Sequence, residues 1–130
     1  MAATVTIDYA SLGGGAGIIV EDTAVSNTAV NNPTGMTGGG TIYYIEVDNT
    51  MNAAATYFKI FNHASPTIGT TAPEIVLKIA ASQRQYMVVP LGYNVSTAAT
   101  YAAFATSSNS AASPAGPSNS VTIRMVVTNA

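Results

Sequence analysis

The sequence predicts an all-β protein with a β-sandwich or jelly-roll-like core and an extended, glycine-rich N-terminal arm. Three observations predict it. After residue 40, six segments rich in β-branched and aromatic residues recur along the chain, the clearest with the two-residue alternation of a strand. Stretches rich in Gly, Pro, Asn and Ser separate these segments, as turns do. The 130 residues are enough for one domain of ordinary size.

The residue pattern indicates the inward face more clearly in some of the six expected strands than in others. They are residues 41–48, 56–62, 74–80, 84–90, 100–106 and 121–128. In the last, Val121, Ile123, Met125 and Val127 alternate with Thr and Arg and should face the core. The Ala-rich stretch 98–103 is assigned to a strand because Thr and Tyr interrupt it and no capping box precedes it.

The first forty residues differ from the rest. They hold two glycine clusters, 13–17 and 38–40, and Tyr9 is their one aromatic residue among ten in the chain. We therefore expect residues 41–130 to bury the sandwich core without them. Segments 3–8 and 17–21 can each form a strand. Two alternatives stay open for residues 1–40: an arm that pairs with a neighbouring molecule, or edge strands of the chain's own sheet.

Composition excludes several classes of partner and site. Charged residues are 8% of the chain and the net charge is −2, so there is no basic field for nucleic acid. The longest apolar runs fall far short of the roughly 20 residues that span a bilayer, and no secretory signal is visible. No Gly-Lys pair exists for a phosphate loop, and no Cys exists for metal or disulfides. We expect no cofactor and no metal.

Three groups of polar residues are weighed as sites. His63 is the one histidine, and we interpret it as a hydrogen-bonded turn residue. Glu46 and Asp48 should share one strand face about 7 Å apart, which is within the range of paired carboxylates in glycosidases. A solvated polar face is the favoured interpretation. Calcium binding by Glu46, Asp48 and Asn49 is a weaker alternative, because the spacing of a calcium loop is missing.

The segment from Lys59 to Ile79 resembles small β-proteins of tailed bacteriophages. The resemblance rests on a strand ending Lys59-Ile60-Phe61-Asn62, a loop from Pro66 to Pro73 with the pattern P-T-x-G-T-x-x-P, the strand that follows, and Leu91-Gly92-Tyr93. It covers residues 56–128 and does not extend to residues 1–40. The best-defined proteins that it resembles are capsid cement, or decoration, proteins.

This resemblance implies a non-enzymatic, oligomeric protein on the capsid exterior, assembled in the host cytoplasm. Its partners would be the major capsid protein and further copies of itself, with a trimer favoured over a dimer. The alternative function is a tail or tail-fibre component that binds a host glycan or another tail protein. A small hydrolase using Glu46 and Asp48 is the third and weakest hypothesis. Whether the Tyr and Phe residues fill the core or form a protein interface is left open.

Overall fold

The computed structural model describes residues 3–12, 15–31, 39–106 and 114–129. These residues form strands and loops without a helix, which confirms the all-β prediction. The strands are β1 (Ala3–Leu12), β2 (Gly15–Val25), β3 (Gly40–Asp48), β4 (Thr56–Asn62), β5 (Ile75–Ile79), β6 (Arg84–Val95), β7 (Ala99–Phe104) and β8 (Val121–Asn129).

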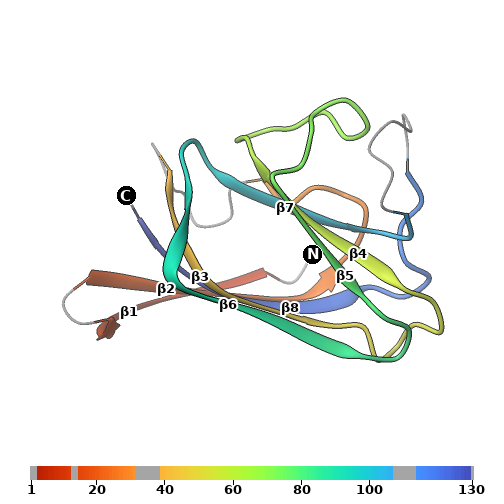
Figure 1. Ribbon diagram of the computed structural model, residues 1–130, viewed down its shortest axis with the longest axis horizontal. Coiled ribbons are helices and arrows are strands. Elements are labelled where there is room, and N and C mark those ends of the chain that lie inside the picture. Colours follow the sequence, from red (N-terminus) through yellow and green to blue (C-terminus); the bar gives the residue numbers. More distant parts are fainter. Residues whose placement is uncertain (1–2, 13–14, 32–38, 107–113, 130) are drawn as a thin grey trace.

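Two antiparallel sheets make up the protein, as Figure 1 shows. The five-stranded sheet has the order β1-β2-β8-β3-β6, and the three-stranded sheet has the order β5-β4-β7. Apolar side chains from both sheets fill the space between them, among them Ile45 and Ile123 from one sheet and Phe58 and Ile79 from the other. The arrangement is consistent with the predicted β-sandwich.

Alternation along the strands determines which side chains enter this core. In β8 the four residues predicted to face inward are all buried, and the intervening Arg124 is exposed. In β4, Phe58 and Ile60 join the main core, whereas Phe61 joins a second apolar cluster with Ala102 and Phe104. Every residue of β7 is buried, because its small Ala side chains are covered on both faces.

Strand β6 continues beyond the predicted end at Pro90. Leu91-Gly92, expected to form a turn, instead lies in an irregularity of the strand, where the pairing partner shifts between Ile42 and Tyr44 of β3. A bulge accommodates a proline because the ladder is already interrupted there. Gly92 has φ +78°, and a Cβ at this position would collide with the side chain of Thr41.

The structure also corrects the expectation that residues 41–130 form the core without the N-terminal segment. Strand β2 pairs with β8 within the chain's own sheet, and Ile18, Val20 and Val25 are buried in the shared core. β1 is the outer strand and pairs with β2. Of the two alternatives for residues 1–40, the structure shows strands of the chain's own sheet. Periodicity did not indicate that β2 reaches the core, because the continuous run Ile18-Ile19-Val20 does not alternate in hydrophobicity. Parts of both glycine clusters (Gly13, Gly14 and Gly38) lie outside the described residues.

Buried polar groups connect loops and sheets. The side-chain amide of Asn49 donates to the carbonyls of Ala54 and Ala80, and its Oδ1 accepts hydrogen bonds from Thr56 (2.6 Å) and Asn52 (2.9 Å). This network ties the β3–β4 loop to the β5–β6 turn.

A second buried contact joins the two sheets. The Tyr101 hydroxyl on β7 donates to Asp22 Oδ2 on β2 at 2.8 Å, with both side chains fully buried. Burial and this hydrogen bond raise the pKa of Tyr101 well above its ordinary value, so the hydroxyl stays protonated as the donor.

Candidate functional site

The outward face of the five-stranded sheet carries an ordered set of side chains, which we call the outer face. Strand register places Glu21, Arg124, Glu46 and Tyr86 in one row across β2, β8, β3 and β6. The neighbouring row is apolar and consists of Ile19, Val126, Tyr44 and Val88. Each of these residues is next in sequence to a residue that faces the core. Because successive side chains of a strand point to opposite faces, these residues point outward.

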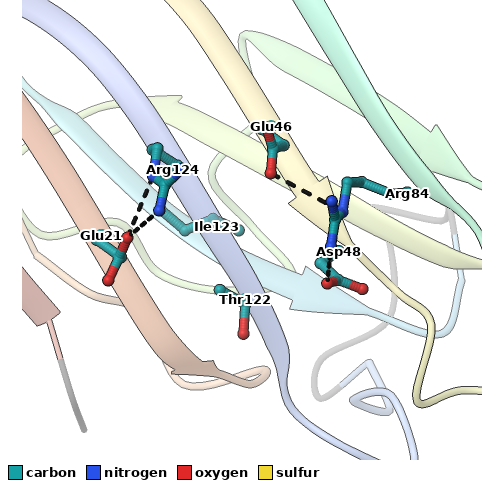
Figure 2. A pocket seen from close by; sticks show the side chains of 7 residues that line it. All are labelled: Glu21, Glu46, Asp48, Arg84, Thr122, Ile123 and Arg124. Carbon is teal, nitrogen blue, oxygen red and sulfur yellow. Dashed lines mark hydrogen bonds and ion pairs between the residues drawn. The ribbon is translucent and has the colours of Figure 1, made fainter.

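An open hollow of about 310 Å³ lies on this face. Its lining residues are Glu21, Glu46, Asp48, Arg84, Thr122, Ile123 and Arg124. Figure 2 shows two ion-paired groups on either side of it, Glu21 with Arg124 and Arg84 with Glu46 and Asp48, contributed by four different strands. The hollow therefore depends on the order of strands in the sheet.

The ion pairs are partly exposed. Arg124 donates to Glu21 Oε2 through Nε at 3.1 Å and also through Nη2. Arg84 Nη2 lies 3.0 Å from Asp48 Oδ2, and its Nε lies 3.9 Å from Glu46 Oε1. The side chain of Arg84 is 59% exposed and that of Arg124 is 53% exposed. Each guanidinium group can therefore contact a ligand while it stays paired with its carboxylate partner.

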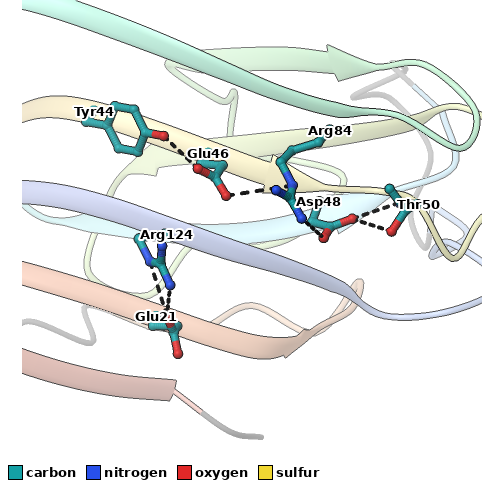
Figure 3. A network of polar contacts seen from close by, with 7 residues as sticks. All are labelled: Glu21, Tyr44, Glu46, Asp48, Thr50, Arg84 and Arg124. Carbon is teal, nitrogen blue, oxygen red and sulfur yellow. Dashed lines mark hydrogen bonds and ion pairs between the residues drawn. The ribbon is translucent and has the colours of Figure 1, made fainter.

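Figure 3 shows a chain of polar contacts along β3, from Tyr44 through Glu46, Arg84 and Asp48 to Thr50. Hydrogen bonds from the Thr50 hydroxyl (2.6 Å) and backbone N–H (2.9 Å), together with Arg84, hold the pKa of Asp48 below its ordinary value. Asp48 is therefore ionised at neutral pH. A glycosidase needs one of its two carboxyl groups to stay protonated, and the surroundings of Asp48 oppose that role.

Two tyrosines lie next to Glu46 on the outer face, outside the lining of the hollow. The rings of Tyr44 and Tyr86 are stacked, with centroids 6.3 Å apart and an interplanar angle of 23°. The Tyr44 hydroxyl donates to Glu46 Oε2 at 2.6 Å, which raises the pKa of Tyr44 and fixes its ring beside the charged row. Tyr86 is 67% exposed, so most of this side chain is open to solvent.

The structure separates the sequence candidates. Glu46 and Asp48 share one strand face as predicted, and that face is polar and partly exposed. Asn49 points the other way, into the protein, where Thr56 and Asn52 occupy its Oδ1. The predicted calcium set of Glu46, Asp48 and Asn49 is therefore not assembled. Among the described residues no group of three or more His, Asp or Glu side chains is arranged to hold a metal ion.

His63 lies apart from this face, in the loop after β4. It is exposed, and its Nδ1 accepts a hydrogen bond from the backbone N–H of Ser65 at 3.0 Å. This confirms the prediction of a hydrogen-bonded turn histidine.

Sequence reasoning missed the four other polar residues that line the hollow: Glu21, Arg84, Thr122 and Arg124. The available signal was the rarity of charge in an 8%-charged chain, but it was ambiguous, because Asp22 and Lys59 are charged strand residues that the structure buries. The strand order needed to bring these residues together is not encoded in any local pattern.

Comparisons with protein-family models, curated proteins and solved structures found no match for this chain. In the part of the chain that the structure describes, no helix has the length and hydropathy needed to cross a membrane.

Proposed function

We propose that this chain is a structural virion protein that decorates a phage capsid and bridges subunits of the major capsid protein. The observation that carries the proposal is the order of the strands. Strands β2-β8-β3-β6 face β7-β4-β5, and Val30 bridges to Tyr101 on the outer side of β7. If the segment around Val30 is counted as a strand beside β7, the chain alternates between layers at every step after β2 except from β4 to β5.

This order supports a jelly-roll-like fold, with the segment around Val30 in the place of an eighth strand. Backbone hydrogen bonds connect Val30 and Tyr101 in both directions, and Ala103 donates to the carbonyl of Ser26. Jelly rolls recur in viral capsid proteins and in lectins. One fold serves many functions, so the function of this chain depends on its surface residues.

The surface suits attachment through many weak contacts. Leu91 is 95% exposed at the β6 bulge, and Val88 on the same strand is 58% exposed. An exposed apolar residue is typical of a protein contact when it lies beside others of its kind. We propose this part of β6 as the capsid contact. Repeated attachment to a shell of identical subunits compensates for a small contact in each copy.

Contacts between copies are proposed at β1. It is the outer strand of the five-stranded sheet, and in Figure 1 the β1–β2 hairpin extends beyond the three-stranded sheet. An outer strand can pair with the sheet edge of a neighbouring molecule, which was one of the two alternatives left open for residues 1–40. We favour a trimer, with a dimer as the alternative.

Cosedimentation tests the capsid contact. The purified chain is mixed with capsids that lack it, prepared from the phage whose genome encodes it. We expect the wild-type chain to sediment with the capsids and Leu91→Asp to lower the bound fraction about tenfold. Met51→Asp is the matched control. Met51 is also exposed (73%), but it lies in the loop after Asp48, at the end of β3 away from the β6 bulge that holds Leu91. No sedimentation of the wild-type chain contradicts the function, and equal binding by Leu91→Asp contradicts the contact.

A tail or tail-fibre component is the second candidate, and the polar hollow with its exposed Tyr86 favours it because such a surface suits a glycan. The two candidates differ in copy number. A capsid decoration protein is present in hundreds of copies per particle, whereas a tail component is present in far fewer.

A further inference from the structure

Half of the chain's charge is concentrated at one place. The sequence holds ten Asp, Glu, Lys and Arg residues, and five of them line the hollow on the outer face: Glu21, Glu46, Asp48, Arg84 and Arg124. Isolated surface ion pairs contribute little to stability, so stability does not account for this concentration in a charge-poor protein. A ligand site does account for it.

The balance of charge restricts the ligand. Three carboxylates and two guanidinium groups give the hollow a net charge of −1. An anionic ligand would meet an excess of carboxylates, and a cation would meet two Arg side chains that are more than half exposed. A neutral ligand with many hydroxyl groups suits both kinds of side chain, because each hydroxyl can donate to a carboxylate and accept from a guanidinium.

An aromatic platform lies beside these polar groups. Tyr86 occupies the same cross-strand row as Glu46 and stacks on Tyr44, which holds the exposed ring in place. The face of an aromatic ring is electronegative and attracts the polarised C–H groups of a sugar ring. Binding sites of this kind combine an apolar surface with a few oriented polar groups.

We propose that the hollow and Tyr86 together form a binding site for a neutral oligosaccharide. One sugar ring lies on Tyr86, and its hydroxyl groups or those of the next ring reach Glu46, Arg84 and Arg124. This site rests on the same surface that favours the tail candidate, and it adjoins the proposed capsid contact at Val88, two residues from Tyr86. Leu91 is five residues from Tyr86 on β6, up to about 17 Å, so a substitution at Leu91 tests the capsid contact without touching the sugar ring on Tyr86.

Titration of the ¹⁵N-labelled full-length chain with neutral pentasaccharides tests the site, using cellopentaose, maltopentaose and chitopentaose as probes. We expect at least one probe to shift the amide signals of Tyr86, Arg84 and Arg124. Tyr86→Ala should weaken its affinity about tenfold, whereas Tyr86→Phe, which keeps the ring, should stay within about twofold of wild type. Leu91→Asp should leave sugar affinity unchanged, which separates this test from that of the capsid contact.

Three results would overturn the proposal. The first is the absence of shifts with all three probes at tens of millimolar. The second is a set of shifts confined to residues away from the outer face. The third is binding of an anionic galacturonic acid oligomer in preference to every neutral probe, which would assign the guanidinium groups to an acidic ligand instead. An unchanged amide spectrum away from residue 86 establishes that each Tyr86 variant is folded.

Discussion

The outward faces of the two sheets differ in what lies on them. On the three-stranded sheet, Phe61, Ala102 and Phe104 are buried in a second apolar cluster, against which Ile68 of the β4–β5 loop packs. Even Lys59 is buried there, with Nζ 4.8 Å from the centre of the Phe104 ring and its pKa lowered by burial. On the five-stranded sheet, the outward side chains form a charged row and an apolar row, and both rows are at least partly exposed.

The difference in coverage indicates which sheet face is available for a partner or ligand. A covered face contributes stability through burial, and substitutions there should unfold the chain. An uncovered face contributes little to stability and can vary with the partner. Ionised groups on the outer face are available to a ligand, whereas Lys59 is enclosed by packing. Substitutions on the two faces should therefore lower stability by different amounts.

Deleting residues 1–40 should have the largest effect, because it removes β2 from the five-stranded sheet. Ile18, Val20 and Val25 would leave the core, each contributing about 1.5–3 kcal/mol, a total comparable to the whole stability of a typical domain. We expect the truncated chain to lack a cooperative thermal transition. Deleting residues 1–12 removes β1 but retains β2, and should leave a folded protein. A cooperative transition in the longer deletion would show that β2 is dispensable.

Phe104→Ala and Tyr86→Ala compare the two outward faces directly. Phe104 is 1% exposed, so truncating it should lower the free energy of unfolding by about 3–5 kcal/mol. Tyr86 is 67% exposed, and its truncation should cost about 0.5 kcal/mol. Urea denaturation followed by tyrosine fluorescence or circular dichroism measures both. Losses of similar size would mean that the two faces are equally covered.

Asp48→Asn should have a small effect on stability, and that effect should depend on pH. The pKa of Asp48 is depressed by Thr50 and Arg84, so its contribution is present above the ordinary Asp pKa and is lost as the pH falls through the lowered one. Because the pair is exposed, we expect a destabilisation of about 0.5–1 kcal/mol at pH 7 that disappears in strong acid. The measurement is the free energy of unfolding of both proteins from pH 7 to pH 2. A difference that is constant over this range would assign the loss to something other than ionisation.

Local patterns predicted the strands better than their arrangement. Residues 56–62 were assigned to a strand with both bounds as in β4, and the inward residues of β8 follow the predicted alternation. The bulge in β6 was missed because Pro90 and Gly92 also typify turns. The role of β2 was missed because a continuous apolar run carries no period.

The candidate site could be predicted only in part, for a related reason. Glu46 and Asp48 are neighbours on one strand, so two-residue periodicity places them on one face. Arg84 and Arg124 come from distant segments, and their approach depends on β3 lying between β6 and β8. Long-range pairing of this kind is decided by the packing of the whole sandwich, which no single segment contains.

The number of copies of this chain in the purified phage particle distinguishes a capsid role from a tail role. Quantitative mass spectrometry against the major capsid protein of the same particle provides the ratio. The capsid role predicts a fixed ratio of copies of this chain to copies of the major capsid protein, with hundreds of copies per particle. A few copies to a few tens, or complete absence from the particle, would contradict the account.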